Sequence, residues 1–152
     1  MSLEPTERVR EFMGWILEST GVDADIEVYE DPEGIAGEFV GEDLGLLIGH
    51  HGQTIDAIQH LAYRIAFRGI EERKGVAIDA SGYRERRAAL LRADGDRAAD
   101  TAVREGRPVS LDAMSPLERK VVHEHLRERH DVETYSEGQE PSRCLVVTPL
   151  VD

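Results

Sequence analysis

The stretch GLLIGHHGQTIDAIQHL, residues 45–61, decides how the first half of the chain folds. Gly49 and Gly52 enclose two histidines where a short apolar segment gives way to a longer periodic pattern. Residues 43–48 allow only a helical turn or two, whereas helical spacing continues from Gly52 to about residue 68. The apolar residues of this second helix are Ile55, Ile58, Leu61, Ala62 and Ile65.

The segments on either side predict a helix, a β-hairpin and a further strand. Residues 9–17 carry apolar side chains at helical spacing between Pro5 and Gly21, which are typical start and stop signals. Residues 25–40 alternate around a Pro-Glu-Gly turn, which favours a hairpin, and residues 75–80 alternate as a third strand. Helices on one face of a three-stranded sheet would bury these apolar side chains, so we expect an α+β fold.

Composition and charge indicate a folded protein built of two modules. The chain has 152 residues, 40% of them hydrophobic, and a net charge of −13. Residues 1–80 hold 6 Lys+Arg against 17 Asp+Glu, whereas residues 81–152 hold 12 against 14. Such asymmetry favours one domain over 1–80 and another over 81–152. No apolar run approaches the roughly 18 residues of a membrane span, and no signal peptide is evident, so we expect a cytoplasmic location.

The second half predicts a long helix followed by a small α/β arrangement. Residues 83–105 carry one apolar helical face, with Gly95 in it as a weak point or a close-packing site. Ser115 to Glu118 form a capping-box signature that begins the next helix. Three short strands complete the prediction, at residues 108–111, 132–135 and 143–148. The apolar face of the long helix comprises Ala88, Leu91, Ala98, Ala99, Ala102 and Val103.

The Gly49 to Gly52 loop has the composition of a phosphate grip. Glycine lets the backbone approach a ligand closely, and the following helix contributes free N–H groups and the positive end of its dipole. A helix-helix turn that needs glycine only for its geometry is the competing interpretation of an isolated Gly-x-x-Gly. The surrounding order of elements favours the grip.

This order of elements resembles the prokaryotic, type II KH domain. The resemblance covers residues 5–80 and implies an αββααβ fold whose loop clamps about four nucleotides of a single strand. The pair inside the loop departs from the family, which commonly has lysine or arginine there. The residues that carry the resemblance are Gly45, Ile48, Gly49, His50, His51, Gly52, Thr54, Ile55, Ala57, Ile58 and Leu61. The implied RNA-binding residues are Gly49, His50, His51, Gly52, Gln53 and Thr54.

The helix after Ser115 carries a second candidate site. Arg119, His123 and Arg127 are four residues apart, which predicts one exposed stripe with Lys120 beside it that could meet successive phosphates. A solvated face balanced by nearby glutamates is the alternative. The pattern around Arg119 and His123 resembles the Arg-x-x-x-His (R-three-H) domain, a module that binds single-stranded nucleic acid. Arg143, in the strand region that completes the resemblance, is a weaker candidate.

A KH domain followed by an R-three-H domain resembles the bacterial Jag family, also called KhpB. The resemblance implies non-catalytic binding of single-stranded RNA, with single-stranded DNA left open, a small single-KH protein as a partner, and a role near cell-envelope growth or membrane-protein insertion. The sequence begins at the KH helix, so the separate N-terminal Jag domain of many members is not expected. Aromatic residues make up 5% of the chain, so few stacking platforms exist and weak sequence discrimination is expected.

Two other functions compete with RNA binding. A protein-interaction adaptor would fit a KH surface that has become acidic and lost RNA. A metal enzyme is disfavoured because His123, His125 and His130 lack the four-residue spacing of helical zinc ligands, and Cys144 is the single cysteine. We therefore expect no enzymatic activity, no metal and no cofactor.

The two loop histidines predict a pH-dependent affinity. With an ordinary histidine pKa near 6.5, His50 and His51 would be mostly neutral at about pH 7.5 and increasingly cationic below about pH 6.5. Affinity for RNA should therefore rise, and its salt dependence steepen, as the pH falls from about 7.5 to 6.

Overall fold

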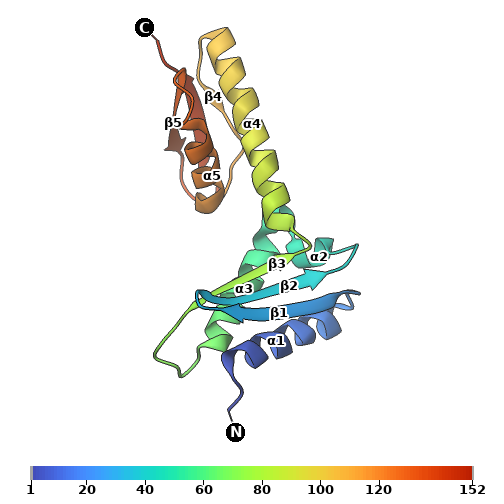
Figure 1. The fold of residues 1–152 in the computed structure, drawn as a ribbon. Coiled ribbons are helices and arrows are strands. Elements are labelled where there is room, and N and C mark those ends of the chain that lie inside the picture. The colour runs from blue at the N-terminus through green and yellow to red at the C-terminus, as the bar shows by residue number, and fades with distance from the viewer. Residues whose placement is uncertain (1, 152) are drawn as a thin grey trace. The chain divides into compact units, whose positions relative to one another are not determined.

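The computed structural model describes residues 2–151, and these form two compact units that divide between Arg84 and Glu85. The first unit has the predicted αββααβ order (Figure 1). A single 3-10 turn, η1, lies inside the Gly-x-x-Gly loop. Its elements are α1 (Pro5–Thr20), β1 (Asp25–Asp31), β2 (Gly34–Val40), α2 (Gly45–Ile48), η1 (His50–Gly52), α3 (Gln53–Ala66) and β3 (Gly75–Ala80).

The sheet of the first unit has the strand order β1-β2-β3. The hairpin strands β1 and β2 are antiparallel, whereas β2 and β3 run parallel and are joined through α2 and α3. A parallel pair needs such a crossover, and the crossover contains the loop of interest. Helices α1 and α3 pack against each other and against the sheet, which confirms the predicted layer arrangement.

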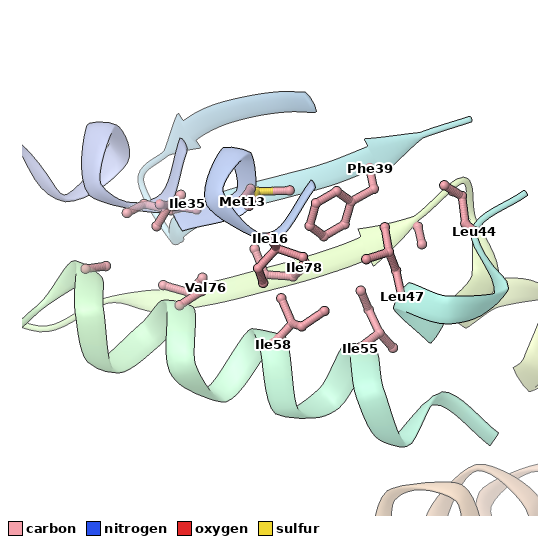
Figure 2. Close-up of a cluster of buried hydrophobic side chains, with 14 of the residues drawn as sticks. Met13, Ile16, Ile35, Phe39, Leu44, Leu47, Ile55, Ile58, Val76 and Ile78 are labelled. Atoms are coloured by element: carbon pink, nitrogen blue, oxygen red, sulfur yellow. The ribbon is translucent and has the colours of Figure 1, made fainter. Parts of the chain in front are cut away.

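The core of the first unit lies between α3, α1 and the sheet (Figure 2). Ile55 and Ile58 of α3 point toward Leu47 and Ile78, and all four are buried. Leu61, which the helical spacing placed in this core, is instead 50% exposed. Its position in the periodic pattern lies at the margin of the apolar face, where the sheet no longer covers the helix.

The second unit is a small α+β arrangement around a second core. Its three-stranded antiparallel sheet has the order β4-β6-β5. The capping box is present: the Ser115 hydroxyl accepts from the Glu118 N–H, and Glu118 Oε2 accepts from the Ser115 N–H, both at 3.2 Å. Its elements are α4 (Tyr83–Glu105), which begins at the unit boundary, β4 (Val109–Ser110), α5 (Pro116–Leu126), β5 (Val132–Glu137) and β6 (Cys144–Pro149).

Helix α4 packs against α5 through Gly95. A Cβ at this position would lie 2.8 Å from Val122 Cγ1, so the glycine is a close-packing site. Val103, predicted on the same buried face, is 44% exposed, because its position in the helical pattern lies at the margin of the apolar face. Within residues 2–151, no helix has the length and apolar character needed to cross a membrane.

Candidate nucleic-acid interface

The Gly-x-x-Gly loop has a backbone geometry that requires its two glycines. Gly49 and Gly52 have φ angles of +73° and +82°, which side-chain-bearing residues rarely adopt. A Cβ at Gly49 would lie 2.1 Å from Thr54 Oγ1, and one at Gly52 would lie 2.8 Å from Tyr83 Cε1. The loop is therefore tight on its inner side, and only its outer side is available to a ligand.

The two histidines between the glycines are both exposed. Their rings stack with centroids 3.8 Å apart and an angle of 27° between the ring planes. His51 itself has a positive φ of 52°, so the backbone turns sharply beneath the stacked pair. The pair presents adjacent imidazole nitrogens at the rim of the loop.

The N-terminus of α3 faces the same loop and has no side-chain cap. The first N–H groups of a helix lack partners within the helix, and they carry the positive end of the helix dipole. Gln53 and Thr54 occupy this first turn and are both exposed. The geometry therefore suits a phosphate at the helix end.

An exposed apolar side chain lies beside the loop: Leu46 of α2, three residues before Gly49, is 64% exposed. Leu61, further along α3, is 50% exposed. Such side chains can lie against base faces while phosphates bind nearby. The sequence did not single out Leu46 as a contact.

Arg119 is not part of an exposed stripe, contrary to the sequence-based prediction. It is only 8% exposed. Its Nη1 donates to the carbonyl oxygens of Met114 at 2.6 Å and Arg143 at 3.4 Å, and its Nη2 forms a 2.5 Å ion pair with Glu140 Oε1. Helical spacing correctly placed Arg119 beside His123, but it could not show that the chain around residues 138–143 covers the guanidinium.

The other predicted residues of the second unit occupy different environments. Lys120 is the most accessible, with 68% of its side chain exposed and a 3.8 Å contact to Glu124. The half-buried His123 is hydrogen-bonded through Nδ1 to Thr134 Oγ1. Arg127 is exposed, whereas Arg143 donates to the carbonyl oxygen of Gly138 at 2.5 Å.

A pocket of about 320 Å³ gathers three of the predicted residues with side chains that sequence reasoning missed. Tyr135 is the most informative addition, because it is 47% exposed and aromatic rings stack on bases. The signal in the sequence was an aromatic residue at an alternating position of a predicted strand. Arg127 and Arg143 do not line this pocket. The lining residues are Pro116, Arg119, Lys120, His123, Thr134, Tyr135, Ser136 and Leu145.

Two further basic side chains, His125 of α5 and Arg129 after this helix, contact acidic partners. His125 Nε2 lies 3.0 Å from each carboxylate oxygen of Asp96. Hydrogen bonds from Arg129 lower the pKa of Asp131, and the same contacts, together with Asp100, raise the pKa of Arg129. Among residues 2–151, no three histidine, cysteine or acidic side chains are arranged to hold a metal ion.

Two family models match successive parts of the chain. Residues 6–78 match the model described as the KH domain of KhpA/KhpB, and residues 91–149 match the R-three-H domain. The fold and the loop thus define a protein with a KH domain followed by an R-three-H domain. The chain belongs to the KhpB (Jag) family, as the sequence predicted.

Curated relatives share this similarity along most of the chain. The RNA-binding protein KhpB of Lactiplantibacillus plantarum is 38% identical over 132 residues, which cover 87% of this chain and 41% of the relative. The RNA-binding protein KhpB of Clostridium symbiosum is 31% identical over 144 residues, covering 93% and 65%. That of Bacillus subtilis is 29% identical over 148 residues, covering 96% and 71%. The chain therefore spans less than two thirds of the first two relatives.

Proposed function

We propose that this chain binds single-stranded RNA and performs no chemistry on it. The observation that carries the proposal is the Gly49 to Gly52 loop, which is tight on its inner side and opens onto an uncapped helix N-terminus. The names of the similar relatives, each an RNA-binding protein, favour the same function.

In the first unit, the strand is held by its backbone. Phosphates meet the loop and the first N–H groups of α3, with Gln53 and Thr54 as polar contacts and the two histidines at the rim. Leu46 provides an apolar surface for a neighbouring base. Because these contacts are to backbone and base faces, the binding should discriminate weakly between sequences.

In the second unit, the pocket on α5 and β5 binds a further part of a strand. Lys120 and His123 supply polar contacts and Tyr135 supplies a stacking surface. Arg119 is a positioning residue here, because its guanidinium fixes the segment around Glu140 and Arg143 rather than facing solvent.

The test of this function changes the loop without disturbing its geometry. We expect the variant His50→Asp/His51→Asp to bind a fluorescent 12-nucleotide RNA at least about tenfold more weakly than wild type at pH 7.5, because two carboxylates would face phosphate. Aspartate tolerates the positive φ of His51. The matched control is His50→Asn/His51→Asn, which is equally tolerated and uncharged and should lose far less affinity.

The result of that comparison decides the assignment. If fluorescence anisotropy gives equal affinity for wild type and both double variants, the loop does not bind RNA. Gly52→Asp is a poorer probe, because its side chain would collide with Tyr83 and a loss of affinity could reflect misfolding.

The family suggests a finer role in bacterial post-transcriptional regulation linked to cell-envelope growth, carried out in the cytoplasm and with a small single-KH protein as partner. Binding of single-stranded DNA to the same loop is compatible with a backbone grip. Sequencing of RNA cross-linked to the protein in cells would identify the targets, and enrichment of envelope-related transcripts is the expected result. Uniform recovery of all transcripts would argue against a dedicated envelope role.

The acidity of the first unit favours one alternative, a protein-interaction adaptor that has lost RNA. Residues 1–80 hold 17 acidic against 6 basic side chains, and a surface of this kind repels nucleic acid. Cross-linking separates the two functions: an adaptor would recover protein partners but no RNA above the background of an unrelated acidic protein.

A further inference from the structure

A second pocket, of about 380 Å³, lies at the C-terminal end of α3 and the loop that follows it. It is distinct from the Gly-x-x-Gly loop, which lies at the other end of the same helix. Three of its lining residues are arginines, in a unit whose charge is strongly negative. The lining comprises Tyr63, Arg64, Ile65, Phe67, Arg68, Gly69 and Arg73.

The three pocket arginines differ from the other cations of residues 2–80 in having no partner. Neither a hydrogen bond nor an ion pair joins the side chain of Arg64, Arg68 or Arg73 to any residue that the structure describes. In contrast, Arg10 pairs with Glu7 at 2.7 Å, and Lys74 lies 4.0 Å from Glu30. The unpaired cations of this stretch therefore all gather at one pocket.

The helix end does not explain this cluster. Cations often gather at a helix C-terminus because its last carbonyl groups are unsatisfied. Here Arg8 already fills that role, since its Nη1 donates to the carbonyl oxygens of Ala66 at 3.2 Å and Arg68 at 2.9 Å, with a longer contact to Ile65. The pocket arginines are therefore not needed to satisfy the carbonyl groups at the end of the helix, and they repel one another unless an anion lies among them.

The outer face of α3 connects the pocket with the Gly-x-x-Gly loop. Gln53, Ala57, His60 and Arg64 follow each other at intervals of four, three and four, which keeps them on one helical face, and none of the four is buried. Asp56, which lies three residues after Gln53 and four before His60, borders this stripe, and its carboxylate pairs with Arg84 at 2.7 Å.

We propose that the Arg64, Arg68 and Arg73 pocket is a second phosphate-binding site for the same nucleic-acid strand that the loop holds. The inference rests on the proposed RNA-binding function. The strand leaves the loop along the outer face of α3, and one or more of its phosphates enter the pocket, where arginine forks suit phosphate oxygens. Residues 53 and 64 are about 16 Å apart along a helix, a distance that about five stacked nucleotides cover.

The test removes two of the pocket charges and compares strands of two lengths. In Arg64→Gln/Arg68→Gln, we expect about tenfold weaker binding of a 12-nucleotide RNA and a salt slope smaller by about 1.4, since each lost phosphate contact on a single strand accounts for about 0.7. A 4-nucleotide RNA, measured by competition, fills the loop alone and should bind wild type and variant equally.

The matched control is Arg10→Gln/Lys74→Gln, which removes the same charge from the same unit outside the pocket. It should leave the salt slope of the 12-nucleotide RNA close to that of wild type. Equal losses in the control and the pocket variant, or equal losses for both RNA lengths, would reduce the effect to net charge and overturn the inference.

Two further outcomes separate this inference from the function on which it rests. If wild type binds the 12-nucleotide RNA and the pocket variant binds it equally well, the pocket fails while the function stands. If wild type binds no RNA, both fail. Binding of free adenosine monophosphate that the pocket variant loses, with RNA affinity unchanged, would assign the pocket to nucleotides and also overturn the strand contact.

Discussion

The buried position of Arg119 makes a sharp prediction about what this residue does. Replacing it by methionine keeps an unbranched apolar stem of similar length but removes the guanidinium. The Met114 carbonyl oxygen then loses the 2.6 Å hydrogen bond from Arg119. The Arg143 carbonyl oxygen also loses its hydrogen bond from Arg119, but it keeps the one from the Met114 N–H at 3.2 Å. Glu140 loses its ion pair but is half exposed, so water compensates most of that loss.

The expected cost follows from these contacts. A hydrogen bond to a charged group contributes about 1.5–3 kcal/mol, and a buried acceptor left without a donor costs about 1–3 kcal/mol. Since both descriptions concern largely the same Met114 oxygen, we expect Arg119→Met to lower the free energy of unfolding of the second unit by about 3 kcal/mol. The matched control, Lys120→Met, changes the neighbouring exposed side chain and should cost less than about 0.5 kcal/mol.

The assay must report on the second unit. The single tryptophan, Trp15, lies in α1, so its fluorescence follows the first unit. Hydrogen exchange measured by mass spectrometry in a urea series, on peptides covering residues 110–150, reports the correct half. The same two variants should affect RNA binding differently under native conditions. Lys120→Met should lower the salt slope of RNA affinity by about 0.7, whereas Arg119→Met should leave that slope unchanged. Unchanged exchange in Arg119→Met together with a reduced salt slope would refute the positioning role and restore Arg119 as a phosphate contact.

Three other changes test separate features of the structure. Gly95→Ala should destabilise the second unit by about 1–3 kcal/mol in a urea titration followed by hydrogen exchange. The added Cβ would lie 2.8 Å from Val122 Cγ1, and this clash outweighs the better helix propensity of alanine. A stabilised variant would show that α4 and α5 can separate freely. Arg129 lowers the pKa of Asp131, so this carboxylate stabilises the fold above its unfolded pKa near 4, and that stabilisation is lost as the pH falls through the lower folded pKa. The difference in the free energy of unfolding between wild type and Arg129→Gln should therefore shrink from about pH 5 to pH 3. For the stacked histidines, RNA affinity should rise between about pH 7.5 and pH 6 in wild type and stay flat in His50→Gln/His51→Gln, and a parallel rise in both would remove the pair from the binding role.

The sequence predicted the elements with strong local signals. The capping box at Ser115 and the helix from Tyr83 to Glu105 appear where they were expected, because N-cap hydrogen bonds and helical periodicity depend on residues a few positions apart. The Gly-x-x-Gly loop was also recognisable, since the steric demand for glycine at its two ends is local.

Features that depend on distant segments of the chain could not be predicted from the sequence. The burial of Arg119 depends on residues more than twenty positions later, and nothing in its own helix indicates that Glu140 covers it. The pocket at the end of α3 needs the loop after the helix to bring Arg73 near Arg64, so three arginines that are scattered in the sequence become one cluster only in the fold. Tyr135 faces the α5 pocket for the same reason, because strand pairing with β6 fixes its place.

In the first unit, geometry and charge are supplied by different residues. The loop shapes a phosphate site through backbone and helix dipole, but neither of the two side chains between its glycines is a lysine or an arginine. The unpaired arginines of that unit lie in the pocket about 16 Å away along α3. If both sites bind one strand, the salt slope at pH 7.5 should come mainly from the pocket, and lowering the pH should add a contribution from the loop. Because the two sites lie at opposite ends of α3, these contributions should add, and the pocket variant should keep the full pH response of wild type. A pH response that disappears with the pocket arginines would mean that the histidines act only through a strand already fixed at the far end of the helix.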